Sequence, residues 1–264
     1  MRDAAPLRSG GQLADAISLR YLVTPPRRLE ARAALVVFPY AGLGGSLAAG
    51  LARVLDLPVA VHGVQLPGRE GRLSEAPLTQ MADVVEAVLP ALAGLTGSPV
   101  ILMGCSFGAL IAYEVAVRLA AMGARPHRLV ALACAAPHLN RKPTGLGVLA
   151  DGEFVEAIDR QFGGVPDVIK QNVELRQLLL PALRADMQLF DTYRWSRRPR
   201  LDVPLLTIAA SDDRQVSPAE LMAWGELTAA SAQHRIVDGG HFVVRENPAA
   251  VGAVLETWLR RSLE

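Results

Sequence analysis

A serine stands between two glycines in the segment Gly104-Cys-Ser-Phe-Gly108. The apolar run Pro99–Met103 precedes this segment, and the helix-forming run Ala109–Arg118 follows it. A G-x-S-x-G pattern between a strand and a helix is typical of a nucleophile elbow, a tight turn that exposes the serine hydroxyl at the positive end of the helix. Its glycines permit the close approach of strand and helix. The sequence therefore predicts that Ser106 is a catalytic nucleophile.

A serine hydroxyl is a weak nucleophile at neutral pH and needs a neighbouring base. After an elbow of this kind, the acid and then the histidine follow the serine along the chain. His241 lies in a glycine-flanked loop after a short predicted strand, from which its ring can reach Ser106. Two adjacent acids, Asp212 and Asp213, also follow a predicted strand, and either one can orient the imidazole. The residues alone leave both aspartates open as the third member of the triad.

Other histidines and acids after the serine occupy less suitable places. His127 and His234 begin predicted strands and His138 begins the lid, so we expect them to be structural or exposed. Asp186 and Asp191 lie on a predicted lid helix, which is the wrong place for an acid that orients the base. No Cys-x-x-Cys or histidine-rich spacing occurs, so we expect no metal and no cofactor.

The oxygen of a tetrahedral intermediate needs two N–H donors. One is expected from the backbone of Phe107, directly after the nucleophile, and the other from the loop that follows the first core strand. In that loop, Pro39–Gly45, Ala41 is the predicted donor. The glycines of the loop also suit a phosphate-binding turn, but no Gly-Lys-Ser/Thr follows them, which argues against nucleotide binding.

Apolar runs alternate with helix-forming segments over most of the chain. This alternation predicts an α/β fold with a mostly parallel, doubly wound sheet. Ser46 is expected to cap a helix that runs to about Leu55, and Ile17–Val23 is expected to form an edge strand. The predicted core strands are Ala34–Phe38, Val59–Gln65, Pro99–Met103, Leu129–Cys134 and Pro204–Ala210.

The alternation stops at about Pro137 and resumes after Pro199. Residues 137–199 hold helical stretches and no good strand, so we expect them to form a helical lid inserted into an α/β-hydrolase core of residues 1–136 and 200–264. Because ligands bind at the carboxyl ends of parallel strands, a lid inserted there covers the site. The helical stretches are Asp151–Phe162, Pro166–Asn172 and Glu174–Tyr193.

Charge and composition argue against several classes of partner. The 264 residues include 27 basic and 26 acidic side chains and no basic arm, so we expect no nucleic acid partner. The uncharged stretch 33–52 contains a proline and four glycines, which indicate strand, loop and helix rather than a membrane span.

Cys105 and Cys134 lie in apolar runs typical of buried, reduced thiols. We expect a cytoplasmic monomer that does not bind membranes.

Several segments together resemble the type II thioesterases of polyketide and nonribosomal peptide biosynthesis, members of the α/β-hydrolase superfamily. The resemblance implies a triad of Ser106, Asp213 and His241, and it thereby favours Asp213. It places the oxyanion donors on Ala41 and Phe107. The segments are Phe38–Gly42, Gln65–Glu70, Gly104–Gly108, Leu179–Asp186, Ser211–Val216 and Gly239–Phe242, of which the second and fourth are more specific than the elbow.

The activity implied by the resemblance is hydrolysis of acyl thioesters on the phosphopantetheine arm of an acyl or peptidyl carrier protein. Such enzymes act in trans and either clear stalled units or release products, through an acyl-serine intermediate. The apolar lid side chains that we expect to line an acyl chamber are Phe154, Phe162, Leu178, Leu179, Leu183, Met187 and Phe190. The arginines after the lid are candidates for carrier docking or for a solvated linker: Arg194, Arg197, Arg198 and Arg200. Arg69 and Glu70 are expected to form a structural ion pair or to anchor a loop, without a role in the chemistry.

The chain departs from the family pattern at three places next to the predicted site. Tyr40 and Cys105 each stand where the family usually has histidine, and the acid loop begins with Ala210-Ser211 rather than Gly-Asp. Three alternatives therefore stay open. Besides thioester hydrolysis, these are an esterase that acts on small esters, an acyl-transfer or cyclising release enzyme, and a non-catalytic binding protein. An intact order of serine, acid and histidine argues against the last.

Overall fold

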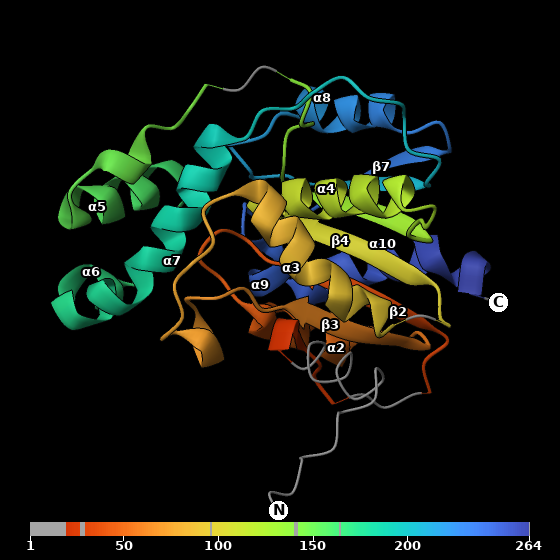
Figure 1. The fold of residues 1–264 in the computed structure, drawn as a ribbon, viewed down its shortest axis with the longest axis horizontal. Coiled ribbons are helices and arrows are strands. Elements are labelled where there is room, and N and C mark those ends of the chain that lie inside the picture. The colour runs from red at the N-terminus through yellow and green to blue at the C-terminus, as the bar shows by residue number, and fades with distance from the viewer. Residues whose placement is uncertain (1–19, 27–29, 96, 140–141, 164, 264) are drawn as a thin grey trace, which may run out of the picture.

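The computed structural model describes residues 20–263 apart from 27–29, 96, 140–141 and 164, and within these ranges seven strands form one sheet (Figure 1). The strand order is β1-β3-β2-β4-β5-β6-β7, and every pairing is parallel except that of the edge strand β1 with β3. The predicted mostly parallel, doubly wound sheet is confirmed. The strands are β1 Leu22–Val23, β2 Ala33–Phe38, β3 Val59–Val64, β4 Val100–Cys105, β5 Arg128–Leu132, β6 Leu205–Ala210 and β7 Ala232–Val237.

Helices cover both faces of the sheet, and each face has its own apolar core. Alternate residues of β2 divide between the two cores, because neighbouring side chains of a strand point to opposite faces. Val36 and Phe38 pack with α3 (Met81–Ala93) and α4 (Phe107–Ala121) on one face. Leu35 and Val37 pack on the other face with α2 (Ala48–Val54), α9 (Val243–Glu246) and α10 (Pro248–Leu263).

Three α-helices between β5 and β6 lie beside the sheet, on the left of Figure 1. They are α5 Asp151–Phe162, α6 Asp167–Gln171 and α7 Val173–Thr192, close to the predicted helical stretches. They have a small core of their own, which includes Phe154 and Ile158 of α5 and Leu180 of α7. Shorter helices complete the fold: η1 Gly45–Leu47, η2 Glu70–Arg72, η3 Leu146–Val148, α8 Pro218–Met222 and η4 Ala223–Leu227.

Two local predictions need correction or completion. The helix predicted to start at Ser46 begins instead at Ala48, because Gly45–Leu47 is a 3₁₀ turn and the Ser46 hydroxyl donates to Glu70 rather than capping the helix. The edge strand predicted at Ile17–Val23 comprises only Leu22–Val23 in the described part, and residues 17–19 lie outside it.

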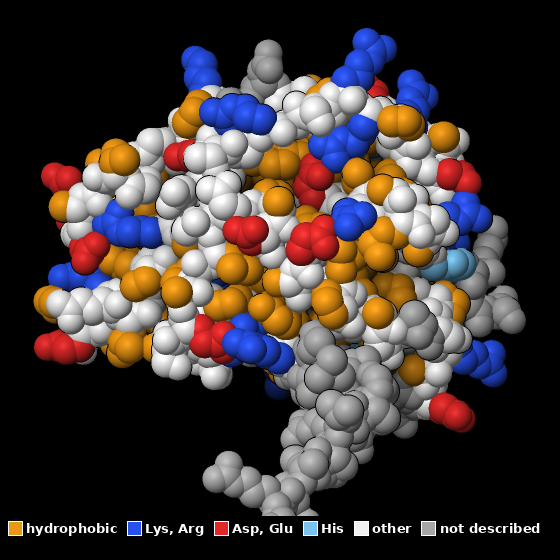
Figure 2. Space-filling view, in the orientation of Figure 1, with side chains coloured by type: hydrophobic (Ala, Val, Ile, Leu, Met, Phe, Trp, Pro, Cys, Tyr) orange, Lys and Arg blue, Asp and Glu red, His pale blue; other side chains and the backbone are white. Residues whose placement is uncertain are grey.

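Charged side chains of both signs are interspersed with hydrophobic ones on the face seen in Figure 2, as the nearly balanced composition predicts. Within the described residues, no helix combines the length and the apolar composition that crossing a bilayer requires.

Candidate active site

Ser106 sits at the turn between β4 and α4 with a φ of 52° and a ψ of −119°, a conformation that non-glycine residues rarely adopt. The glycines on either side are required by close backbone contacts. A Cβ on Gly104 would lie 2.2 Å from the Cα of Ala109, and one on Gly108 would lie 2.2 Å from the carbonyl oxygen of Phe38. The glycine–serine–glycine pattern is therefore a steric consequence of packing strand and helix tightly around an exposed hydroxyl.

The imidazole of His241 bridges Ser106 and Asp213. Its Nε2 lies 2.9 Å from the Ser106 Oγ, and its Nδ1 lies 2.9 Å from the Asp213 Oδ2. Because an ionised carboxylate only accepts hydrogen bonds, Nδ1 carries the proton in this arrangement and Nε2 is free to accept the serine proton. The chain separates the serine from the histidine by 135 positions, and the sheet brings them together.

The structure distinguishes the two aspartates that the sequence leaves open. The Asp213 side chain is 1% exposed and its Oδ1 accepts the backbone N–H of Gln215 at 2.8 Å, whereas Asp212 is exposed. The neighbouring strands β6 and β7 align the acid loop with the histidine loop, and the Asp212 N–H donates to the Gly239 carbonyl oxygen. Ser211 adds a contact here, because its hydroxyl accepts the Gly239 N–H at 3.3 Å.

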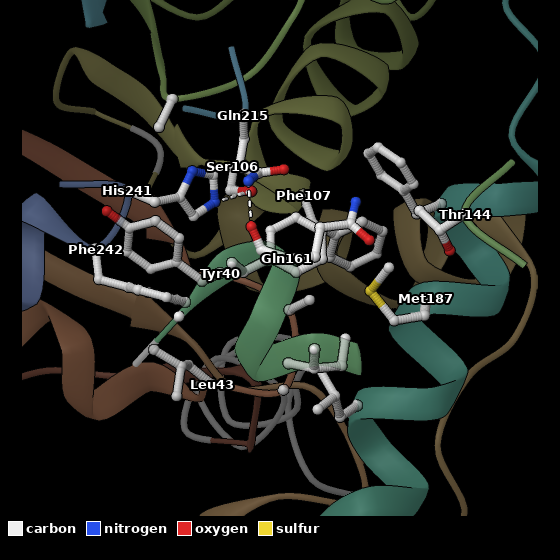
Figure 3. Close-up of a pocket in the computed structure, with 18 of the residues that line it drawn as sticks. Tyr40, Leu43, Ser106, Phe107, Thr144, Gln161, Met187, Gln215, His241 and Phe242 are labelled. Atoms are coloured by element: carbon white, nitrogen blue, oxygen red, sulfur yellow. Dashed lines mark hydrogen bonds between the residues drawn. The ribbon is translucent and has the colours of Figure 1, made fainter. Parts of the chain in front are cut away.

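Three aromatic rings surround the imidazole of His241. The ring centroids of Tyr40, Phe162 and Phe242 lie 5.8, 5.7 and 5.3 Å from its own. Phe162 ends the lid helix α5, and beside it the carbonyl oxygen of Gln161 accepts a hydrogen bond from the Gln215 side chain. Figure 3 shows Gln161 and Gln215 next to Ser106. The lid therefore contacts both the base and the loop of the acid.

The two predicted oxyanion donors line the same cavity. Ala41 belongs to the loop after β2, and Phe107 is the first residue of α4, where backbone N–H groups lack partners within the helix. Both residues line the pocket together with Ser106 and His241. Because both line the cavity that contains Ser106, Ala41 and Phe107 stay the predicted oxyanion donors.

The cavity between lid and core has a volume of about 500 Å³ and a mainly apolar wall. Five of the seven lid residues predicted to line an acyl chamber do so, whereas Phe154 is buried in the small core of the lid and Leu178 is half exposed. Lys142 and Arg245 also border the cavity and are exposed. The five predicted lid residues that line the cavity are Phe162, Leu179, Leu183, Met187 and Phe190.

Tyr40 and Cys105, which depart from the family pattern, are both buried. Burial raises the pKa of the Cys105 thiol, and burial together with the neighbouring Cys105 raises the pKa of the Tyr40 phenol. Both groups are therefore neutral around pH 7. The Tyr40 oxygen accepts the N–H of Val244 at 3.4 Å, so the tyrosine helps to hold the segment after His241.

Of the other residues considered from the sequence, His234, His138 and Asp191 have contacts away from the triad, whereas the buried Nε2 of His127 has no hydrogen-bond partner among the described residues. His234 contacts Thr207 at 2.7 Å and His138 contacts Glu226 at 3.2 Å. Asp191 accepts hydrogen bonds from Thr144 within the lid region. No cluster that fits a metal ion occurs in the part of the chain that the structure describes.

The basic cluster after the lid is only partly free, because Arg198 pairs with Glu114 at 2.8 Å. Arg194 donates to backbone carbonyl oxygens beside it, whereas Arg197 and Arg200 are exposed. No sequence pattern signals the contact of Gln215 with the lid, since its partner is a backbone carbonyl oxygen 54 positions away.

Comparison with known proteins identifies relatives over nearly the whole chain. A family model described as a thioesterase domain matches residues 33–261. The linear gramicidin dehydrogenase LgrE of Brevibacillus parabrevis is 30% identical over 92% of this chain and 94% of its own. The probable anguibactin biosynthesis thioesterase AngT of Vibrio anguillarum is 31% identical over 84% of this chain and 89% of its own.

A solved structure shares the fold of this chain. The RedJ thioesterase from the prodiginine biosynthetic pathway of Streptomyces coelicolor is 36% identical, with a TM-score of 0.80 over 89% of this chain and 95% of its own. The name of LgrE denotes a dehydrogenase, whereas the family model and the other two names denote thioesterases. The arrangement of serine, histidine and aspartate agrees with the latter.

Proposed function

This chain belongs to the thioesterase domain family, and on that premise we propose that it hydrolyses acyl thioesters carried on the phosphopantetheine arm of a carrier protein, in trans, with Ser106 as nucleophile. The observation that carries the proposal is the continuous contact from Asp213 through His241 to Ser106 at the end of an apolar cavity. The names of its relatives support a place in nonribosomal peptide or polyketide biosynthesis.

In the acylation step, the Ser106 Oγ attacks the thioester carbonyl carbon as its proton passes to Nε2 of His241. The carboxylate of Asp213 stabilises the imidazolium that forms. The N–H groups of Ala41 and Phe107 bind the oxygen as it becomes negative. When the C–S bond breaks, the thiol leaves with the proton from Nε2, and the acyl group stays on Ser106 as an ester.

In the deacylation step, a water molecule attacks the acyl-Ser106 ester while His241 takes one of its protons. The same N–H groups bind the second tetrahedral oxygen, and Nε2 returns the proton to the Ser106 oxygen as the C–O bond breaks. A free carboxylic acid then leaves the cavity. Tyr40, Phe162 and Phe242 shield the imidazole from bulk water, which strengthens its interactions with both partners.

The acyl group occupies the apolar cavity between lid and core, and the phosphopantetheine arm reaches it from the rim. Lys142 and Arg245 border the cavity and expose their charges, which suits the phosphate of the arm and the acidic surface of a carrier protein.

Intact-mass spectrometry after mixing with acylated carrier proteins of several chain lengths tests the proposal. We expect an acyl adduct on the wild-type protein, release of free acid, and neither outcome for Ser106→Ala. Parallel reactions with an oxygen ester of the same acyl chain distinguish a thioesterase from a general esterase. A product in which an amine or hydroxyl of the substrate has displaced Ser106 would identify acyl transfer instead of hydrolysis.

A further inference from the structure

Two segments that mark the family resemblance, Gln65–Glu70 and Leu179–Asp186, supply no member of the triad. The structure brings them together beside the loop that carries Ala41. Arg69 and Asp186, which are 117 positions apart in the chain, form a bidentate ion pair with N–O distances of 2.5 and 2.9 Å. Their side chains are 4% and 0% exposed. Burying two charges costs desolvation energy, which a buried ion pair offsets only when its geometry is good and its remaining polar atoms are hydrogen-bonded. The other hydrogen bonds of this pair are therefore informative.

The ion pair holds the loop of Ala41 through backbone groups. The Gly42 N–H donates to the Asp186 Oδ2 at 2.8 Å, and Arg69 Nη1 donates to the Leu43 carbonyl oxygen at 3.3 Å. The Leu43 N–H donates to the Tyr40 carbonyl oxygen at 3.1 Å. These contacts therefore connect the lid helix α7, which carries Asp186, to the turn in the core.

Each of the two peptide units flanking Ala41 is held by one of these bonds. The Tyr40 carbonyl oxygen and the Ala41 N–H belong to one planar unit, which the Leu43 N–H fixes. The Gly42 N–H belongs to the next planar unit, which Asp186 fixes. The Ala41 N–H lies in the first unit, and the second unit, joined to it at the Ala41 Cα, restricts its rotation.

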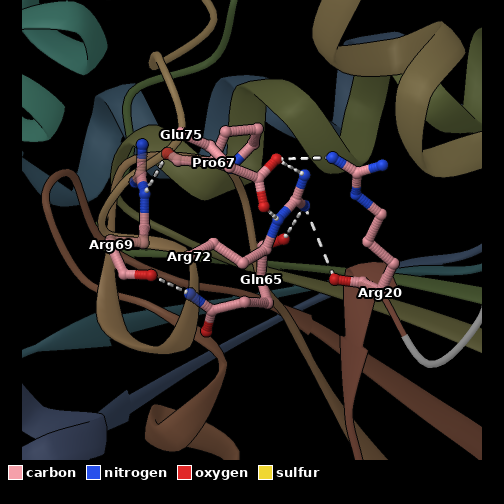
Figure 4. Close-up of polar contacts among 6 residues, drawn as sticks. All are labelled: Arg20, Gln65, Pro67, Arg69, Arg72 and Glu75. Carbon is pink, nitrogen blue, oxygen red and sulfur yellow. Dashed lines mark hydrogen bonds and ion pairs between the residues drawn. The ribbon is translucent and has the colours of Figure 1, made fainter.

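The rest of the segment 65–70 holds the far end of the same loop. The Gln65 Oε1 accepts the Gly45 N–H at 2.8 Å, and its Nε2 donates to the Arg69 carbonyl oxygen at 2.6 Å, as Figure 4 shows for the latter. Glu70 accepts the hydroxyl of Ser46 at 2.5 Å. The loop is thus supported along its length, and Asp186 is the one support in this set that comes from the lid.

We propose that Asp186 is a positioning residue that aims the Ala41 N–H at the oxyanion, so that the oxyanion hole is complete only while the lid helix α7 is seated on the core. The inference rests on the proposed function, in which Ala41 is a donor. Asp186 itself touches neither substrate nor triad. It acts through the N–H of Gly42, and Arg69 holds its carboxylate in place.

A matched pair of double variants isolates the hydrogen bond from Gly42. Arg69→Met with Asp186→Asn removes both buried charges and keeps an oxygen that can accept the Gly42 N–H. Arg69→Met with Asp186→Leu removes the same charges and leaves no acceptor. We expect the leucine variant to have a kcat about 10- to 100-fold below that of the asparagine variant, with KM changed by less than about twofold, because the lost contact acts in the transition state.

An alkyl boronic acid provides a readout that a merely structural role would not move. It forms a tetrahedral adduct with Ser106 whose oxygen occupies the oxyanion position, so its inhibition constant should rise by the same factor as kcat falls. Asp191→Asn is the control, because Asp191 lies on the same helix and anchors Thr144 rather than the loop. We expect it to lower the melting temperature without changing the boronate inhibition constant.

Equal kcat and equal boronate inhibition for the two double variants would overturn the proposal. If the double variants do not fold, Asp186→Glu keeps both charges and displaces the acceptor by one methylene. Wild-type kcat and boronate inhibition in that variant would likewise overturn it. A wild-type protein that neither hydrolyses acyl thioesters nor labels at Ser106 would instead refute the proposed function, so the two failures are distinguishable.

Discussion

The side-chain amide of Gln215 donates a hydrogen bond to the backbone carbonyl oxygen of Gln161, and this contact joins the loop of the acid to the end of the lid helix α5. The backbone N–H of the same glutamine donates to Asp213 at 2.8 Å. One residue therefore contacts the carboxylate that orients His241 and the segment that covers the site. The two contacts use different groups, so a substitution can separate them.

Gln215→Ala should release the end of α5 and leave the triad in place, because only the side-chain contact is lost. We expect faster hydrogen exchange in residues 151–162, since that helix loses a connection to the core. Hydrolysis of a small acetyl ester should change by less than about threefold, because the backbone bond to Asp213 remains. Exchange mass spectrometry and a steady-state assay give the two readouts. Unchanged exchange over α5 would show that this contact does not hold the lid.

Ser106→Gly should be more stable than Ser106→Ala, although both variants should be inactive. The φ of 52° at this position costs an alanine or a serine free energy that a glycine does not incur. We expect a difference of about 1 kcal/mol in the free energy of unfolding. Urea denaturation of the two variants measures it directly. Equal stabilities would mean that the surrounding backbone relaxes once the serine is replaced.

Asp213→Asn should reduce kcat by about 10³- to 10⁴-fold, because the amide favours the wrong tautomer of His241. Asp212→Asn is the matched control, since this exposed neighbour has the same side chain and no contact with the imidazole. Its kcat should stay within about twofold of the wild-type value. Steady-state assays on one thioester substrate compare both. A larger loss for the Asp212 variant would reassign the acid.

Met187→Trp should shorten the space available to the acyl chain. Met187 is buried on α7 and lines the cavity, where Figure 3 shows its side chain on the side away from His241. We expect kcat/KM for an octanoyl thioester to fall by about 10-fold or more, and that for an acetyl thioester to change by less than about twofold, because a short chain does not reach the new ring. Equal losses for both chain lengths would place Met187 outside the acyl site.

The free energy of unfolding should fall as the pH rises above about 9, because Cys105 and Tyr40 have raised pKa values in the folded protein. The unfolded chain ionises these groups near their ordinary pKa values of about 8.5 and 10, whereas the folded chain keeps them protonated. The folded state then binds more protons, so stability decreases with increasing pH. Urea denaturation between pH 8 and 10.5 checks the slope, which Cys105→Ala should reduce. An unchanged slope in that variant would assign the effect to other groups.

Local sequence patterns were sufficient for most of the fold. The apolar runs on either side of the elbow and the glycines at positions 104 and 108 predict a strand, a tight turn and a helix, because the constraint is steric and acts within a few residues. The limits of α5, Asp151–Phe162, agree with those predicted from its residues. The Ser46 prediction was wrong, because Glu70 binds the hydroxyl that was expected to cap the helix.

By itself, then, the sequence determined the alternation of strands and helices, the serine at the elbow and the two histidine and acid loops that can serve it. Only the tertiary structure decided which aspartate faces His241 and that the lid residue Asp186 pairs with Arg69. The physical reason is range. Turn geometry and strand periodicity depend on neighbours in the chain, whereas a hydrogen bond between side chains 117 positions apart exists only after the sheet and the lid have packed.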